Sequence, residues 1–296
     1  MLKPLVYLLL FACLVVYPKT GQSAEVNTYT IGPELKILRI LDKPNKIGKA
    51  YLLGAKDNAL DSLLENGLCP SSYSTFLIVK GKDSVLIDTG NGASNQGKTL
   101  ELLALHGFAP KSIKNIVLTH MHGDHILGLF NGQAKAFPEA TVYVEASEYK
   151  FWSDRKNMHL APKGQAKCFD LAEAFKKTYG DKVKLFQAGE TLFKFLKTTA
   201  TPGHTTGHTS FELSLNDQKY LIVGDVLHCL KVQTLMPQVT VPWDTDQNLA
   251  IKTREKLLNE VADTQTVILG SHFPEPGAFH ISKNGSSFSY LEVTPK

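Results

Sequence analysis

The sequence lacks any apolar run long enough to cross a membrane and any large excess of charge of one sign. Its longest apolar stretch, from Leu5 to Tyr17, has 13 residues, whereas a spanning helix needs about 20. The formal net charge of +4 over 296 residues is too small to predict a polyanionic partner such as nucleic acid. No linker rich in Pro, Gly or Ser interrupts the chain, and 43% of its residues are apolar. These features exclude a disordered chain and predict one globular domain.

The first residues follow the pattern of a secretory signal peptide. Lys3 precedes the apolar stretch, and small or polar residues occupy positions 19–24, which is the order of such peptides. We therefore expect residues 1–23 to be removed on export to the periplasm or beyond, leaving residues 24–296 as one domain without a stable membrane span. Because Lys3 and Lys19 leave with the peptide, the net charge falls from +4 to +2. A lipid-modified Cys13 is the alternative.

Cysteines are scarce, and none of them form a CxxC pair. After removal of the signal peptide three remain, at Cys69, Cys168 and Cys229. Export permits one disulfide and one leftover thiol, but three buried thiols are equally compatible with the sequence. The pairing stays open at this point.

Apolar periodicity predicts strands mixed with helices from about residue 73 onward. Such a mixture in both halves of the chain indicates a layered α/β fold. The expected strands are 74–80, 84–87, 115–119, 140–145, 183–186, 192–199, 209–215, 220–223 and 266–269, and the expected helices are 99–106, 170–179 and 246–261.

Three histidines and an aspartate lie together in the segment Thr119-His120-Met121-His122-Gly123-Asp124-His125, directly after an expected strand. Alternate side chains of an extended segment share a face, so His120 and His122 can point at one metal ion. A turn at Gly123 then aims Asp124 and His125 at another. The competing interpretation is a loop whose aspartate caps a helix and whose histidines are solvated. The density of ligand residues favours a metal site.

Further candidate ligands follow later strands, at His204, Asp225 and His272. Each taken alone would be interpreted as a packed or surface residue. Two catalytic metals need more ligands than the first motif supplies, so together the three residues complete a binuclear site. His208, four residues after His204, is a candidate for a further ligand, but we expect it to be structural because the site is already full. His106, His159 and His280 have no comparable pattern and are expected to be structural.

The ligand spacing resembles the metallo-β-lactamase superfamily, with intervals of 82, 21 and 47 residues linking His122, His204, Asp225 and His272. The resemblance implies an αββα four-layer sandwich with the site at one edge. It implies one metal held by His120, His122 and His204, another held by Asp124, His125 and His272, and Asp225 bridging both. Asp88, in Leu86-Ile87-Asp88-Thr89-Gly90, matches the family aspartate that orients a ligand.

Within the superfamily, the chain is most similar to the methyl parathion hydrolase group and next to the quorum-quenching acyl-homoserine lactonases. The similarity to the first group lies in stretches such as Gly224-Asp225-Val226-Leu227-His228 and Ser271-His272-Phe273-Pro274. It implies two divalent cations, most simply Zn²⁺ with Mn²⁺, Co²⁺ or Fe²⁺ as alternatives, and a possible homodimer. A hydroxide bridging the cations would attack an ester, lactone or phosphotriester, and Asp124 or Asp225 would carry the proton.

The resemblance also suggests residues that contact the substrate. Trp152 and Phe169 match aromatic pocket positions, which implies a hydrophobic small-molecule substrate. His228 stands where lactonases carry a tyrosine and is expected to donate to the developing oxyanion or to pack beneath the site. The polar loop 91–97, with Asn95 and Gln96, favours an ester or lactone over a phosphotriester.

Three alternative functions are weighed against a binuclear hydrolase. A persulfide dioxygenase-like enzyme on the same fold would use a single iron, and it would leave Asp124, His125 and His272 without a role. A glyoxalase II-like thioesterase would require a carboxy-terminal glutathione-binding domain, which the sequence does not suggest. A non-catalytic metal-binding protein would have lost ligands, and all seven are present.

Overall fold

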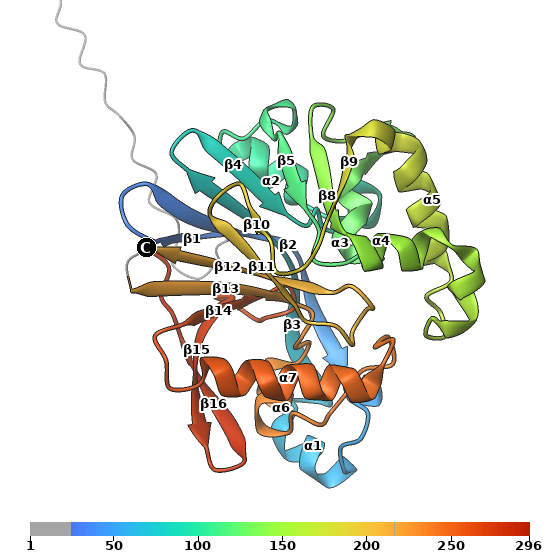
Figure 1. The fold of residues 1–296 in the computed structure, drawn as a ribbon. Helices are drawn as coiled ribbons and strands as arrows, with labels where there is room; N and C mark the ends of the chain where they lie inside the picture. Colours follow the sequence, from blue (N-terminus) through green and yellow to red (C-terminus); the bar gives the residue numbers. More distant parts are fainter. Residues whose placement is uncertain (1–24, 216) are drawn as a thin grey trace, which may run out of the picture.

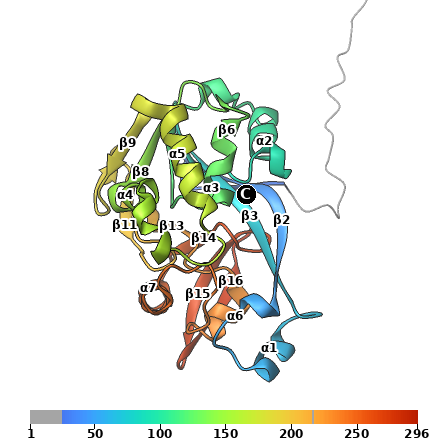
Figure 2. The same ribbon diagram turned by 90° about the vertical axis from the view of Figure 1, so that its right-hand side faces the viewer.

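The computed structural model describes residues 25–215 and 217–296, and the predicted signal peptide and Cys13 lie outside these residues. Two sheets of seven strands face each other, and helices cover their outer faces (Figures 1 and 2). The strands are β1 (Val26–Thr30), β2 (Leu35–Gly48), β3 (Leu68–Lys80), β4 (Asp83–Ile87), β5 (Asn115–Val117), β6 (Phe130–Asn131), β7 (Ala134–Lys135), β8 (Thr141–Glu145), β9 (Val183–Phe186), β10 (Thr191–Leu192), β11 (Leu196–Ala200), β12 (Thr209–Leu215), β13 (Gln218–Gly224), β14 (Val267–Gly270), β15 (Ala278–Asn284) and β16 (Ser287–Glu292). The α-helices are α1 (Asp57–Leu63), α2 (Thr99–Leu105), α3 (Gly123–Ile126), α4 (Ala146–Ser153), α5 (Lys167–Tyr179), α6 (Leu230–Leu235) and α7 (Gln247–Val261).

The first sheet has the order β1-β2-β3-β4-β5-β8-β9, and the second has the order β10-β11-β12-β13-β14-β15-β16. A separate pair, β6 and β7, forms a small antiparallel ribbon. The two large sheets are mixed: β4, β5, β8 and β9 run parallel in the first, and β13 and β14 run parallel in the second.

The alternating side chains of the strands explain why the first sheet packs against a layer on each of its faces. In β3, Phe76 and Ile78 face the second sheet, where they join a core with Phe211 and Ile222. Leu77 points the other way, into a core that the first sheet shares with α2, α4 and α5. Successive side chains of a strand point to opposite faces, so one strand contributes to both cores.

Helix α7 covers the outer face of the second sheet, where Leu257 and Leu258 pack with Ile268 and Phe279. Asp246, at the position before this helix, accepts a hydrogen bond from Leu249 N at 2.9 Å and caps its first turn. The four layers are therefore helix, sheet, sheet and helix, and the expected αββα sandwich is confirmed.

One expected strand, 192–199, is in fact a hairpin. Phe193 and Lys194 have φ values of 53° and 66°, and the chain reverses between β10 and β11, which pair antiparallel. Neither residue type signals a turn, so periodicity alone did not reveal the reversal. Strands β1, β2, β6, β7, β15 and β16 were not predicted from apolar periodicity.

The structure answers the question that the cysteines left open. Cys69 in β3 and Cys229, the residue before α6, form a disulfide with a Cα–Cα separation of 6.0 Å. Cys168 is a free, buried cysteine in α5. No helix among residues 25–215 and 217–296 combines the length and hydropathy that a membrane crossing requires.

Candidate metal centre

The ligand residues gather where strands of both sheets end. Asp88 follows β4 and the His120 segment follows β5, whereas Asp225 and His272 follow the parallel strands β13 and β14. The carboxyl ends of neighbouring parallel strands meet at one edge of a sheet. The fold therefore brings together residues that are more than 150 positions apart in the sequence.

His120, His122 and His204 form the first cluster. All three are buried, with exposures of 0%, 3% and 2%, and their candidate ligand atoms lie within 4.8 Å of one another. His122 Nδ1 lies 3.0 Å from His204 Nε2. The other ring nitrogen of His204, Nδ1, lies 2.8 Å from Asp244 Oδ1. Because a carboxylate only accepts hydrogen bonds, Nδ1 carries the proton and Nε2 is left with a free lone pair.

Asp124, His125, Asp225 and His272 form the second cluster. Asp124 Oδ2 lies 3.4 Å from His125 Nε2 and 3.5 Å from His272 Nε2. In both rings, the nitrogen that faces away from the cluster makes a hydrogen bond. His125 Nδ1 donates to Asp88 Oδ2, and His272 Nδ1 donates to the Ser72 carbonyl, each at 2.8 Å. Both rings therefore present Nε2 to the site.

Asp88 holds more than one ligand in place. Its carboxylate also accepts from the backbone N–H and the hydroxyl of Thr119, each at 2.8 Å, so it fixes the start of the histidine segment as well as the His125 ring. Its φ of 59° lies in the left-handed region, which aspartate tolerates better than most residues. Asp88 thus contacts both the start of the histidine segment and the ring of His125.

Asp225 belongs to the second cluster and also faces the first. Its Oδ2 is 2.9 Å from His272 Nε2, 3.3 Å from His204 Nε2 and 3.8 Å from His120 Nε2, and its Oδ1 is 3.3 Å from His125 Nε2. One carboxylate therefore faces ligands of both clusters, which is the geometry of a bridging group.

Buried polar atoms without partners indicate what this site accommodates. Among the described residues, the Nε2 atoms of His120, His122 and His125 and the Oδ1 atom of Asp225 are buried and make no hydrogen bond. Buried polar groups are normally satisfied, and imidazole nitrogens with carboxylate oxygens are the donor set of Zn²⁺ and related cations. The residues present fit a pair of divalent metal ions.

The electrostatics of the two clusters differ. Burial lowers the pKa of His120 and His122 well below the ordinary imidazole value, so both remain in the neutral form that binds metal. Burial acts the same way on His125, but the carboxylates of Asp225, Asp124 and Asp88 outweigh it and raise its pKa. The carboxylates make the second cluster more negative than the first, so it attracts a cation more strongly.

A sequence profile of the Metallo-beta-lactamase superfamily matches residues 70–272, more than half of the chain and all seven candidate ligands. The chain belongs to the metallo-β-lactamase superfamily. The family predicted from the ligand spacing is thereby confirmed, and with a His/Asp site of the binuclear type the protein is a metal-dependent hydrolase of this superfamily.

Individual relatives match parts of this superfamily member. Metallo-beta-lactamase domain-containing protein 1 of Mus musculus is 40% identical over 81 residues, which are 26% of this chain and 29% of the relative. A hydroxyacylglutathione hydrolase of Salmonella paratyphi A is 30% identical over 161 residues, which are 53% of this chain and 49% of the relative. The chain thus spans less than half the length of either curated relative.

Solved structures resemble the chain over most of its length. The hydrolase AbOPH, of the beta lactamase superfamily, has a TM-score of 0.85 at 29% identity and covers 93% of this chain and 99% of its own. AidC, a dizinc quorum-quenching lactonase, has a TM-score of 0.80 at 23% identity and covers 91% of this chain and 98% of its own. At 23% identity, the comparison with AidC shows a shared fold alone.

Two other buried histidines of this superfamily member lie close to the ligands. His208 Nε2 accepts from the backbone N–H of Asp225 at 3.0 Å, and its Nδ1 lies 2.8 Å from the Thr201 hydroxyl. Burial lowers its pKa to about 3, so it is a neutral packing residue, as expected. His228 Nε2 lies 3.2 Å from Asp225 Oδ2 and its ring stacks on His272. His106, His159 and His280 each contact a backbone carbonyl elsewhere.

Two buried acids that support the site were missed by the sequence analysis. Asp244 orients His204, as described above. Glu148 in α4 is 1% exposed and accepts from Met121 N at 2.9 Å, Trp152 Nε1 at 2.8 Å and Gly207 N at 2.8 Å. It therefore ties the His120 segment to the loop after His204. For Glu148, the only signal available in the sequence was an acidic residue on the apolar face of a helix.

A cavity of about 530 Å³ opens over the metal site. His122, Asp124, Asp225, His228 and His272 form its floor, and its other lining residues include Lys43, Asn45, Lys46, Ile47, Tyr51, Tyr73, Asn91, Asn95, Leu127, Gln165, Lys167 and Trp243. Most of these side chains are polar, which differs from the hydrophobic walls that the sequence predicted.

Trp152 and Phe169 lie in the hydrophobic core and are not among the residues that line this cavity. They are 0% and 1% exposed, their rings are 5.0 Å apart, and the Trp152 ring lies edge-on to His122 at 5.5 Å. Their placement differs from the pocket position expected for them, because the apolar faces of α4 and α5 turn both rings towards the first sheet.

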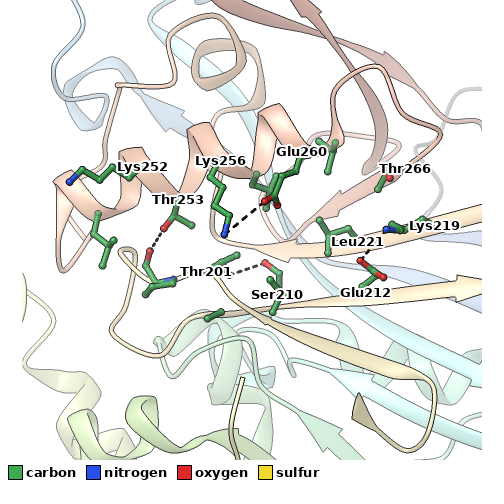
Figure 3. Close-up of a pocket in the computed structure, with 16 residues that line it drawn as sticks. Thr201, Ser210, Glu212, Lys219, Leu221, Lys252, Thr253, Lys256, Glu260 and Thr266 are labelled. Atoms are coloured by element: carbon green, nitrogen blue, oxygen red, sulfur yellow. Dashed lines mark hydrogen bonds and ion pairs between the residues drawn. The ribbon is translucent and has the colours of Figure 1, made fainter. Parts of the chain in front are cut away.

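A second cavity of about 370 Å³ lies between α7 and strands β11 to β13 (Figure 3). Thr201, Ser210 and Leu221 line it on the sheet side, and Thr253 and Lys256 line it on the helix side. None of its described lining residues is a candidate metal ligand. Of these two cavities, the first is the one that candidate metal ligands line.

Proposed function

We propose that this protein is an exported binuclear hydrolase that cleaves an ester or a lactone. The observation that carries the proposal is the position of Asp225, whose carboxylate faces both ligand clusters. A mononuclear site would need only the first cluster, so the complete second cluster argues against an iron dioxygenase on the same fold.

His120, His122 and His204 would hold one cation, Asp124, His125 and His272 the other, and Asp225 both. Two divalent cations at such a site lower the pKa of a water molecule towards neutrality and polarise a carbonyl oxygen. We propose zinc for both positions, because neutral imidazoles and carboxylates suit it. AidC, described as a dizinc enzyme, supports this choice by analogy.

The residues of the chain supply orientation and proton handling. Asp124 reaches the cavity with a side chain that is 24% exposed, so it is the carboxylate placed to take a proton from the nucleophile. Burial, with Asp124 and Asp225 nearby, raises the pKa of Tyr73 to about 12. Its phenol stays protonated at neutral pH and can donate a hydrogen bond into the cavity, a role that the sequence analysis had considered for His228.

The ester or lactone class is supported by the cavity and by the comparisons. AidC is described in complex with N-hexnoyl-L-homoserine, a lactonase product, and AbOPH is described as a hydrolase. The loop that contributes Asn91 and Asn95 to the cavity is polar, which favours these substrates over an apolar phosphotriester.

The test is metal content and activity of purified residues 24–296, prepared without added metal. We expect about two zinc, manganese or cobalt ions per chain and hydrolysis of an ester or lactone panel. Asp225→Asn is expected to lose metal and at least about a hundredfold in kcat/KM together. One iron per chain with oxygen uptake would overturn the proposal, and a fully metallated, fully active variant would overturn the bridging role of Asp225.

Export is the second part of the proposal. It rests on the signal-like residues 1–23, and the disulfide between Cys69 and Cys229 supports an oxidising compartment. Expression of the full chain in a Gram-negative host, followed by fractionation and amino-terminal sequencing, tests it. We expect a periplasmic or secreted product that begins at Ala24 or Glu25. A cytosolic product that retains residues 1–23 would contradict export.

A further inference from the structure

Three lysines lie at the cavity over the metal site. Lys43 and Lys46 come from β2, and Lys167 is the first residue of α5. Among residues 25–215 and 217–296, the side chain of Asp57 aside, none of the three forms an ion pair with a carboxylate. Lys43 Nζ donates only to the Asn95 carbonyl, at 3.3 Å. The cavity's own carboxylates, Asp124 and Asp225, are occupied with the ligand clusters.

Most lysines of the second cavity are paired with a carboxylate. There, Lys219 lies 3.5 Å from Glu212 and Lys256 lies 3.8 Å from Glu260, as the dashed lines in Figure 3 show. The third lysine of that cavity, Lys252, forms no ion pair with a described carboxylate. Two of three lysines are therefore paired at the cavity without ligands, and none of three at the cavity over the metal site.

The position of Lys167 has no explanation in helix stability. The amino-terminal end of a helix carries partial positive charge, so a lysine there is unfavourable. No side chain caps α5, and the acid of its first turn, Asp170, pairs with Arg155. A cation placed at the positive end of a helix and at a cavity mouth is instead positioned to attract an anion.

An aromatic wall lies beside the floor of the same cavity. The rings of Tyr51 and Trp243 are 5.5 Å apart, and Trp243 lies edge-on to His228 at 5.7 Å. This wall offers a surface for an apolar or planar part of a substrate. Asn45, Asn91 and Gln165 add hydrogen-bonding groups to the rest of the lining.

We infer that the substrate of this enzyme is an anionic ester or lactone, whose carboxylate or phosphate is recognised by Lys43, Lys46 and Lys167 while its scissile carbonyl lies over Asp225. The inference rests on the proposed hydrolase function and names the substrate class of the same site. It replaces the hydrophobic substrate that Trp152 and Phe169 suggested, because the cavity is lined by amides and ammonium groups in their place.

Two esters that differ only in a terminal group provide the first test. p-Nitrophenyl valerate and mono-p-nitrophenyl glutarate share a leaving group and a chain length, but only the glutarate ester ends in a carboxylate. We expect kcat/KM to be about tenfold higher for the glutarate ester, mainly through KM, since three partly exposed ion pairs supply roughly that factor. The advantage should shrink as NaCl is raised, because salt screens such pairs.

Charge-matched triple variants identify the lysines. In Lys43→Gln/Lys46→Gln/Lys167→Gln, the ratio of kcat/KM for the two esters should fall to about one. The control is Lys36→Gln/Lys82→Gln/Lys197→Gln, which removes the same charge at exposed lysines that do not line the cavity, and its ratio should equal that of the native protein. Equal values for the two esters in the native protein, or a ratio that both triple variants reduce alike, would overturn the inference.

A binding measurement separates this inference from the proposed function. If the metal-loaded protein cleaves no member of the ester and lactone panel, the hydrolase proposal fails, and calorimetric titration of glutarate into the metal-free protein then tests the lysines alone. Binding that is weakened at least about tenfold in the cavity variant and unchanged in the control supports anion recognition. Binding that is absent, or that the cavity variant leaves unchanged, contradicts it.

Discussion

At the scale of single residues, the site depends on groups that hold the outer nitrogens of its histidines. Asp88 binds His125, Asp244 binds His204, and the Ser72 carbonyl binds His272, each at 2.8 Å. Each contact fixes the tautomer and the ring orientation, so that Nε2 points inward before any metal arrives.

Asp244→Asn tests this orienting role. An amide oxygen accepts the hydrogen bond from His204 Nδ1 less strongly than a carboxylate does. We therefore expect metal affinity to fall 10- to 100-fold, roughly the loss seen when such partners are removed. Competition with a chromophoric chelator measures it. Asp246→Asn is the control, since that residue caps α7 and asparagine caps helices equally well. Equal affinities for the two variants would exclude the orienting role of Asp244.

At the scale of elements, β3 forms one side of the site. Its Ser71 hydroxyl donates to the His272 carbonyl at 3.1 Å, and its Ser72 hydroxyl donates to the Phe273 carbonyl at 2.7 Å. The disulfide from Cys69 joins the beginning of this strand to Cys229, the residue after His228. Strand β3 is thereby tied to two loops that carry site residues.

Removal of the disulfide is expected to destabilise the protein. The bond joins residues 160 positions apart and restricts the unfolded chain, so Cys69→Ser/Cys229→Ser should lower the free energy of unfolding by about 2 to 4 kcal/mol. Urea denaturation with and without reductant measures this. The control Cys168→Ser should remain sensitive to reductant, and a native protein whose stability does not depend on reductant would contradict the pairing.

The free cysteine of α5 gives a companion measurement. Burial, with Asp124 nearby, raises the pKa of the Cys168 thiol to about 12, so the reactive thiolate is scarce at pH 8. A thiol reagent should label no cysteine of folded residues 24–296 and one after unfolding without reductant. Rapid labelling of the folded protein would show that α5 does not protect Cys168.

At the scale of the whole molecule, the metal site joins the two sheets. The segment with His120, His122, Asp124 and His125 follows a strand of the first sheet, while His204, Asp225 and His272 follow strands of the second. Bound cations should therefore stabilise the packing between sheets as well as catalyse. The homodimer implied by the resemblance stays a prediction, which sedimentation of the mature chain tests.

Alkaline pH should destabilise the folded protein through two buried tyrosines. Burial raises the pKa of Tyr29 and Tyr179 to about 12, and both phenols donate to backbone carbonyls. Between pH 10 and 12 the unfolded chain releases protons that the folded chain retains, so stability falls as pH rises. Denaturation at several pH values measures the slope. Tyr29→Phe/Tyr179→Phe should reduce the slope, with Tyr73 left to contribute, and an unchanged slope would contradict this origin.

The sequence by itself determined the family, the α/β class and the seven candidate ligands. Four ligands lie within six residues, and the others directly follow apolar strands, so local spacing was sufficient to find them. Boundaries were close wherever periodicity was clean, as in β9 and β12, and wrong at the β10 to β11 hairpin, whose turn residues carry no turn signal.

Only the tertiary structure decided which residues surround the ligands. Asp244, Glu148 and Tyr73 reach the site from elements distant in the chain, and the pairing of Cys69 with Cys229 depends on β3 passing beside the residue before α6. Trp152 turned into the core while Lys43 lined the cavity. The physical reason is that metal ligands follow local spacing, whereas the walls of a cavity are set by how separate elements pack.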